Sequence, residues 1–144
     1  MFAGLFAVFG RIMLALIFII SGAAKLSDIS GTATYMTANG LPPSLALPVA
    51  LFEVVGGAMI VLGIFTRLTA PAFAAFCVLT ALLFHRETAD AMQATAALKN
   101  IAIAGGFLCL FAYEGKSWSL DSYRARRREE ATRDPVVHPG VGAG

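Results

Sequence analysis

Charged residues are scarce in this 144-residue chain, and their scarcity excludes most soluble folds. Only 14% of the residues are Asp, Glu, Lys or Arg, whereas 58% are hydrophobic and the mean hydropathy is +0.74. A typical soluble domain has about 25% charged residues. The two cysteines form no CxxC pair, so neither a disulfide framework nor a thiolate metal site is predicted. The composition predicts a small integral membrane protein.

Motifs for several kinds of chemistry are missing as well. The chain has no phosphate-binding loop and no dinucleotide fingerprint. Of its two histidines, only His85 adjoins an apolar run, so haem ligation inside a bundle is not expected. We predict no metal site and no covalently bound cofactor, and we assign no catalytic residue. The basic cluster at 124–128 is short and is followed by Glu129 and Glu130, so nucleic-acid binding is not expected either.

Four apolar runs are each long enough to cross a membrane, since about 20 helical residues span the hydrocarbon core. They cover residues 5–26, 44–65, 68–85 and 96–113. We therefore predict an all-α fold, a four-transmembrane-helix bundle, for residues 1–113. The first run is a full crossing long and the first ten residues of the chain include no basic side chain, so we expect a membrane helix and not a cleaved signal peptide.

The basic residues predict the orientation of the bundle. With four crossings both termini share a side, and that side collects Arg67 and the arginines of 124–128. Basic residues favour the cytoplasmic side, so we expect both termini to be cytoplasmic. In the outer loop between the first two runs, Asp28 or Ser30 is expected to begin a short amphipathic helix that stops at Gly40. Residues 114–144 are expected to form a mostly disordered cytoplasmic tail.

Charged residues within three of the runs share a helical face with small residues. The three faces are Arg11, Ala15, Phe18, Gly22 and Lys25; then Ala46, Ala50, Glu53 and Gly57; then Lys99, Ala102, Gly106, Cys109 and Tyr113. Small residues mark close helix contacts in membranes. These faces are therefore expected to point toward one another inside the bundle.

Glu53 is the centre of the predicted site, because an ionisable residue in lipid is costly and normally faces a partner. We expect it to be ionised and paired at the floor of an outward-opening polar pocket. The pocket candidates are Glu53, Lys25, Arg11, Lys99, Asn100 and His85. A purely structural interpretation stays open, since a buried ion pair can simply fix helix packing and lysines can extend to the headgroups.

Several short motifs, taken in order, resemble the DoxX family. They are Gly10-Arg11, Ser21-Gly22-Ala23-Ala24-Lys25-Leu26, Tyr35-Met36, Gly40-Leu41-Pro42, Glu53-Val54-Val55-Gly56-Gly57, Gly63-Ile64-Phe65-Thr66-Arg67, Phe84-His85 and Lys99-Asn100. The resemblance covers about residues 10–113. It implies a multi-pass protein of the cell inner (plasma) membrane that is associated with redox chemistry. Members of the family include a subunit of a thiosulfate:quinone oxidoreductase and a membrane partner of a superoxide dismutase and a sulfurtransferase.

Three functions remain open at this point. In the first, the pocket binds a quinone or a small sulfur compound, with Glu53 handling protons and Lys25, His85, Lys99 or Asn100 binding oxygens. In the second, the chain is a noncatalytic membrane anchor or scaffold for superoxide- or thiol-detoxifying enzymes. In the third, it is a small oligomeric cation transporter, which the basic neighbours of Glu53 disfavour. The expected partners are the lipid bilayer, redox-enzyme subunits and, given the abundant Gly and Ala, a second copy of the chain.

Overall fold

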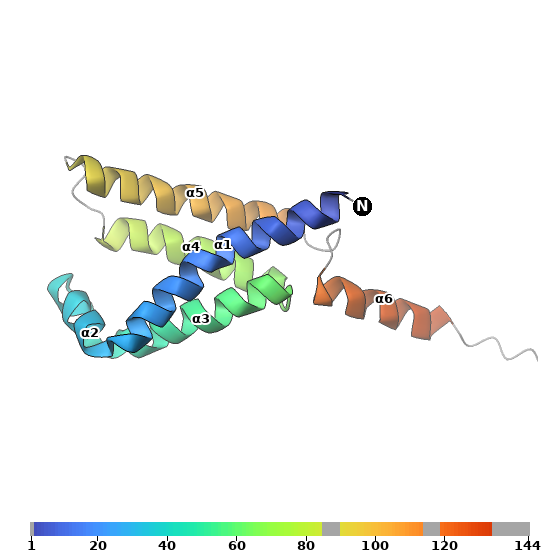
Figure 1. The fold of residues 1–144 in the computed structure, drawn as a ribbon, viewed down its shortest axis with the longest axis horizontal. Helices are drawn as coiled ribbons and strands as arrows, with labels where there is room; N and C mark the ends of the chain where they lie inside the picture. The colour runs from blue at the N-terminus through green and yellow to red at the C-terminus, as the bar shows by residue number, and fades with distance from the viewer. Residues whose placement is uncertain (1, 85–89, 114–118, 134–144) are drawn as a thin grey trace, which may run out of the picture.

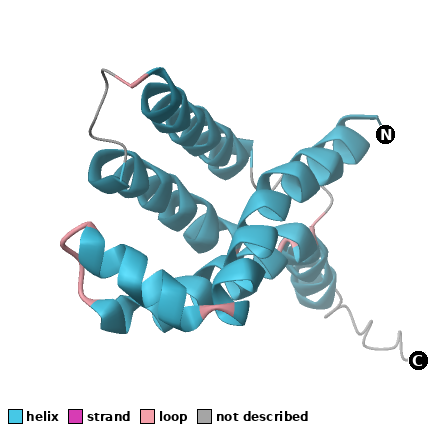
Figure 2. Ribbon diagram, turned by 60° about the vertical axis from the view of Figure 1, so that its left-hand side comes forward, coloured by secondary structure: helices cyan, strands magenta, loops and turns pink. Residues whose placement is uncertain are grey.

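The computed structural model describes residues 2–84, 90–113 and 119–133, and the regular structure in these ranges is helical (Figures 1 and 2). Four helices are long and apolar enough to cross a membrane, which confirms the four predicted helices. They are α1 (Phe2–Ser27), α3 (Ala46–Leu62) with the preceding 3-10 turn η1 (Pro43–Leu45), α4 (Thr66–Phe84) and α5 (Ala91–Tyr113). Two further helices, α2 (Ile29–Ala38) and α6 (Leu120–Arg133), lie at opposite ends of the bundle (Figure 1).

The long helices pack as two pairs, α1 with α3 and α4 with α5 (Figure 1). The first pair is close because glycines lie at its contacts. A Cβ atom on Gly22 would lie 2.8 Å from the carbonyl oxygen of Ala50, and one on Gly57 would lie 2.7 Å from Cγ1 of Ile19. Small residues allow such an approach between membrane helices. The predicted small-residue faces of these two helices do face each other.

A cluster of phenylalanines joins the two pairs. The Phe73 ring of α4 lies 4.5 Å from Phe18 of α1, 4.7 Å from Phe52 of α3 and 5.1 Å from Phe107 of α5, measured between ring centroids. Aromatic pairs at these separations attract one another beyond the burial of their surface. Each long helix therefore contributes a phenylalanine to a single aromatic cluster in the core of the bundle.

The prediction that the Lys99 face of α5 points into the bundle is wrong. Lys99, Ala102 and Cys109 are exposed, whereas Ala104 and Phe107 are buried. Alanine and glycine occur all around this helix, so the spacing of small residues does not define its rotation. The insertion of Phe107 into the aromatic cluster defines it instead, and this turns the Lys99 face away from the bundle.

Helix α2 begins and ends where the sequence predicts a short helix. Oδ1 of Asp28 accepts a hydrogen bond from the backbone N–H of Gly31 at 2.9 Å, the usual role of an N-cap aspartate. This bond, with a weaker effect of the Ser30 hydroxyl, lowers the pKa of Asp28 from its ordinary value. At the other end Gly40 adopts a left-handed conformation with φ of 75°, which terminates the helix.

Helix α6 occupies residues that the sequence assigned to a mostly disordered tail. Ser119 Oγ accepts a hydrogen bond from a backbone N–H of its first turn, and the arginines, alanines and glutamates that follow are good helix formers. Asp121 fixes the helix to the bundle: its Oδ2 accepts from the N–H of Thr66 and its own N–H donates to the carbonyl of Gly63, both at 3.1 Å. The turn between α3 and α4 is thus the docking point of α6.

Candidate functional site

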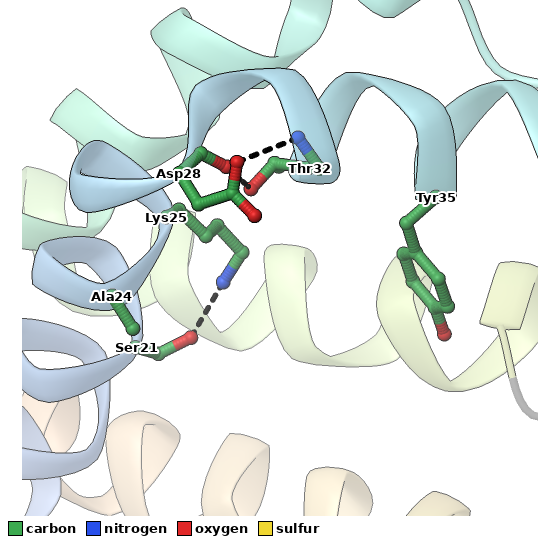
Figure 3. Close-up of a pocket in the computed structure, with 7 residues that line it drawn as sticks. Ser21, Ala24, Lys25, Asp28, Thr32 and Tyr35 are labelled. Atoms are coloured by element: carbon green, nitrogen blue, oxygen red, sulfur yellow. Dashed lines mark hydrogen bonds between the residues drawn. The ribbon is translucent and has the colours of Figure 1, made fainter.

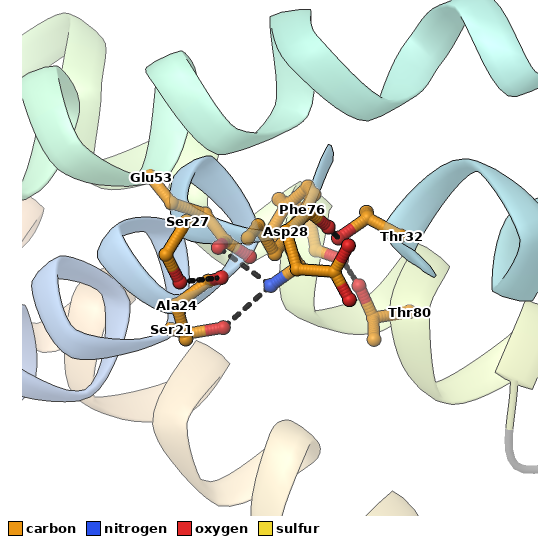
Figure 4. A network of polar contacts seen from close by, with 9 residues as sticks. Ser21, Ala24, Ser27, Asp28, Thr32, Glu53, Phe76 and Thr80 are labelled. Carbon is orange, nitrogen blue, oxygen red and sulfur yellow. Dashed lines mark hydrogen bonds and ion pairs between the residues drawn. The ribbon is translucent and has the colours of Figure 1, made fainter. Parts of the chain in front are cut away.

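The predicted ion pair of Glu53 is present, and its partner is Lys25. Nζ of Lys25 lies 2.7 Å from Oε2 of Glu53 and donates a second hydrogen bond to Oγ of Ser21 at 2.5 Å (Figure 4). Ser21 lies four residues before Lys25, so the two side chains share a face of α1. The Glu53 side chain is 4% exposed and that of Lys25 is 27% exposed. The carboxylate is therefore buried while the ammonium reaches toward the surface.

A pocket of about 350 Å³ opens onto this pair between α2, η1, α3 and α4. Its walls are mostly apolar and include Met36, Phe76 and Leu79. Met36 is 4% exposed, so α2 contributes a buried side chain to the pocket as well as a cover over it. The charged pair is thus placed at one side of a mostly apolar chamber.

The polar atoms of the pocket offer a defined set of hydrogen bonds. The hydroxyl of Thr32 donates to the carbonyl of Asp28 at 2.9 Å, and that of Thr80 donates to the carbonyl of Phe76 at 2.8 Å (Figure 4). Both hydroxyl oxygens keep lone pairs as acceptors. In its contacts within the described residues, Lys25 Nζ uses two of its three N–H donors. The pocket therefore combines a cationic donor with hydroxyl acceptors.

A second groove, of about 420 Å³, adjoins the pocket along α1 and α2 (Figure 3). Ser21 and Asp28 line it, and Lys25, Thr32 and Tyr35 line both the groove and the pocket. Lys25 consequently lies between a polar groove that contains Asp28 and the apolar chamber that contains Glu53. Tyr35 stacks on Phe84 of α4, with ring centroids 5.4 Å apart and planes at 9°, which closes α2 onto the bundle.

Arg11 does not join the pocket, contrary to the prediction. It is 2% exposed and belongs to the opposite end of the bundle, where a Cβ atom on Gly63 would overlap its guanidinium. Gly63 follows Glu53 by ten residues, which corresponds to about 15 Å along a helix. The two ends of the bundle therefore hold separate charged groups.

The remaining predicted candidates are not brought to Glu53 in the described part of the chain. Lys99 is exposed and Asn100 is half-buried, and neither lines the pocket, because α5 is rotated by its aromatic contact. His85 lies outside the described residues.

Sequence reasoning missed the hydroxyl groups around the pair. Ser21 had a usable signal, because it lies one helical turn before Lys25 on a face already predicted to be buried. Thr32 and Thr80 had none, since their approach to the pocket depends on how α2 folds over α4. Within the described residues no group of three or more His, Cys, Asp or Glu could hold a metal ion.

Comparison with known proteins places this chain in a family. Residues 6–86 match the DoxX family model, and this range includes Lys25, Glu53 and the three helices around the pocket. The chain belongs to the DoxX family. Inner membrane protein YqjF of Escherichia coli (strain K12) is 39% identical to this DoxX chain over 111 residues, which are 77% of the chain and 85% of YqjF. Inner membrane protein YphA of the same organism is 40% identical over 118 residues, 77% of the chain and 84% of YphA.

A further relative carries a name that refers to redox chemistry. The Bacillus subtilis (strain 168) protein named "Putative oxidoreductase CatD" is 31% identical over 64 residues, 44% of this DoxX chain and 48% of that protein. No solved structure gives a significant match. This DoxX chain is a multi-pass protein of the inner membrane, because its relatives YqjF and YphA are inner membrane proteins and four of its helices are apolar and long enough to cross a membrane.

Proposed function

We propose that this DoxX protein binds a quinone in the pocket between α2, α3 and α4 and takes part in membrane redox chemistry. The observation that carries the proposal is the Lys25–Glu53 pair at the side of a mostly apolar chamber. A quinone is a flat, apolar ring with oxygen acceptors at its edge. The third N–H of Lys25 donates to one oxygen, while Phe76 and the aliphatic walls contact the ring.

The size of the chamber supports a ring-sized ligand. Ligand pockets commonly measure about 300–1,000 Å³, and this one has about 350 Å³. It accommodates a quinone headgroup, and an isoprenoid tail would extend between the helices into lipid. A small sulfur compound is the other ligand class that Lys25 could bind, but the apolar walls favour the quinone.

Reduction of a quinone to a quinol takes up electrons and an equal number of protons. The chain contains no motif for a redox centre, so the electrons are expected to come from a partner subunit. Glu53 is suited to pass protons to a quinone oxygen held by Lys25, because both groups line the chamber. Asp28 lines the adjoining groove together with Lys25. The relative named for oxidoreductase chemistry supports this assignment.

Co-purified quinone provides the first test. The protein is purified in mild detergent as wild type, Glu53→Gln, Lys25→Met and Lys99→Met, then extracted with organic solvent, and quinone per protein is measured by liquid chromatography and mass spectrometry. Lys99→Met is the matched control, because it removes an exposed lysine that does not line the pocket. We expect quinone in the wild type and the control and its loss in both pocket variants. Equal quinone in all four samples would refute the site.

A noncatalytic anchor for redox enzymes is the second candidate, and α6 favours it. This helix projects beyond the end of the bundle (Figure 1). Its exposed residues include Arg124, Arg127 and Arg128. An anchor would bind its partner enzymes through this region. Deletion of residues 114–144 would then abolish co-purification of those enzymes, whereas a quinone site would keep its ligand. Absence of quinone from every sample, with loss of partners on deletion, would favour the anchor.

The orientation that we propose places both termini in the cytoplasm. The start of α4, whose second residue is Arg67, and the arginine-rich helix α6 lie at one end of the structure, and α2 lies at the other (Figure 1). Basic residues concentrate on the cytoplasmic side of membrane proteins. Residues 1–113 then form the membrane domain, 114–144 the cytoplasmic extension, and the quinone pocket opens toward the outer side. Fusion of alkaline phosphatase to the C-terminus should give an inactive reporter, and a fluorescent protein fused there should fold.

A further inference from the structure

Two hydroxyl groups that line the chamber have already used their hydrogens. Oγ1 of Thr80, on α4, donates its hydrogen to the backbone carbonyl of Phe76 at 2.8 Å (Figure 4). Oγ1 of Thr32, on α2, donates in the same way to the carbonyl of Asp28 at 2.9 Å. A carbonyl oxygen only accepts, so the direction of both bonds is fixed, and each hydroxyl keeps only its lone pairs for a ligand. Both threonines are therefore acceptors toward the chamber.

The charged pair adds one further acceptor and one donor. In its contacts with other described residues, Glu53 accepts only through Oε2, from Nζ of Lys25 at 2.7 Å, which leaves Oε1 for a ligand. After its bonds to Ser21 and Glu53, Lys25 has one N–H to donate. The hydroxyl of Tyr35 can donate or accept, so it favours neither kind of ligand. The side chains that line the chamber thus offer more acceptors than donors.

The two redox forms of a quinone differ in the hydrogen bonds that they can make here. The oxygens of the quinone are carbonyls and only accept, whereas the oxygens of the quinol are hydroxyls that donate one hydrogen bond each and still accept. A bound quinone can use Lys25 but leaves the threonines and Oε1 of Glu53 without a donor, and unpaired polar groups in an apolar space cost free energy. A quinol can accept from Lys25 and donate to a threonine or to Glu53 as well.

We propose that the chamber binds the quinol, which carries two more electrons and two more protons, more tightly than the quinone, and that the Thr80 hydroxyl contributes to this preference. The inference rests on the proposed function and adds the redox form that the site prefers. Tighter binding of the reduced form raises the midpoint potential of the bound couple, so a quinone in the chamber is easier to reduce than one in the bilayer. A tenfold preference corresponds to about 30 mV for a two-electron couple.

The test compares two threonines of α4 that make the same backbone bond. Binding of decylubiquinone and of decylubiquinol to full-length wild type, Thr80→Val and Thr69→Val is measured by equilibrium dialysis in mild detergent under argon. Thr69 is the matched control, because its hydroxyl donates to the carbonyl of Phe65 at 3.1 Å on the same helix and it does not line the chamber. We expect the wild type and the control to bind the quinol about tenfold more tightly than the quinone. Thr80→Val should weaken quinol binding about fivefold, the loss of one hydrogen bond, and change quinone binding less than about twofold.

A further variant and the remaining outcomes decide between a hydrogen bond and packing. Thr80→Ser restores a hydroxyl and should return most of the wild-type preference for the quinol. Equal weakening of both redox forms in Thr80→Val, or no recovery in Thr80→Ser, would show that Thr80 acts through packing and would overturn its assigned role. Equal affinity of the wild type for the two forms would overturn the preference while leaving the quinone site in place. Absence of binding of either form to the wild type would refute the proposed function itself, and this inference with it.

Discussion

Removing either member of the Lys25–Glu53 pair should destabilise the bundle, and the two removals should differ in size. Glu53 is 4% exposed, so Lys25→Met leaves a buried carboxylate without its cation, a change that costs about 3–5 kcal/mol in buried pairs. Lys25 is 27% exposed and has a flexible stem. In Glu53→Gln its ammonium can bond the amide oxygen or move toward the groove, so we expect a loss of only about 1–2 kcal/mol.

Thermal unfolding in mild detergent near neutral pH, followed by circular dichroism, measures this asymmetry. At about 2–4 °C per kcal/mol, Lys25→Met should lower the midpoint by roughly 10 °C and Glu53→Gln by roughly 4 °C. The double variant Lys25→Met with Glu53→Leu should recover much of the loss, because no charge is left buried. Lys99→Met should leave the midpoint within about 2 °C of the wild type, since Lys99 is exposed. If the two single variants lose the same stability, or the double variant equals the sum of both, the argument from burial is wrong.

Three further predictions concern the elements that hold the site. Gly22→Val should lower the unfolding midpoint and weaken the ion pair, because an added Cβ would already lie 2.9 Å from Cβ of Glu53; Gly22→Ala should have the same sign and a smaller effect. Asp121→Ala removes the acceptor of the Thr66 N–H and should expose α6 to limited proteolysis while leaving quinone content unchanged. The pKa of Asp28 is lowered by folding, so ionised Asp28 stabilises the folded state. This stabilisation is complete above about pH 4 and is lost as the pH falls through the lowered pKa. Asp28→Asn keeps the cap without titrating, so acidification should destabilise α2 in the wild type more than in this variant, measured by proteolysis with an acid protease.

The sequence predicted the parts of the fold that depend on local chemistry. Apolar runs of sufficient length gave the four long helices, and Asp28 and Gly40 gave the ends of α2. The pairing of Glu53 with Lys25 was predictable because a carboxylate inside a membrane helix needs a partner and a lysine shared the small-residue face of the preceding apolar run. Small residues on both helices let that face approach closely enough for the pair to form.

What the sequence did not predict depends on contacts between distant segments. The rotation of α5 follows from one aromatic contact of Phe107, and a helix with alanine and glycine on every side gives no competing signal. The docking of α6 depends on Asp121, whose carboxylate binds a backbone N–H 55 residues earlier in the chain. Every residue except proline has a backbone N–H, so no sequence pattern shows which one will bind the carboxylate of Asp121. Arg11, expected near Glu53, precedes Lys25 by 14 residues on α1, about 21 Å along a helix, so it lies at the other end of the bundle.

The geometry of the pair supports the proposed ligand site over the other two functions that the sequence left open. A cation transporter needs a carboxylate that exchanges its cation, yet Glu53 is held by an ammonium at 2.7 Å in a position that is 4% exposed. A scaffold needs the pair only for packing, and protein interiors without a ligand are close-packed because unfilled space costs stability. Here the pair borders a chamber of about 350 Å³, and Lys25 lines both this chamber and a polar groove. Space beside a charged donor is what the proposed ligand site requires.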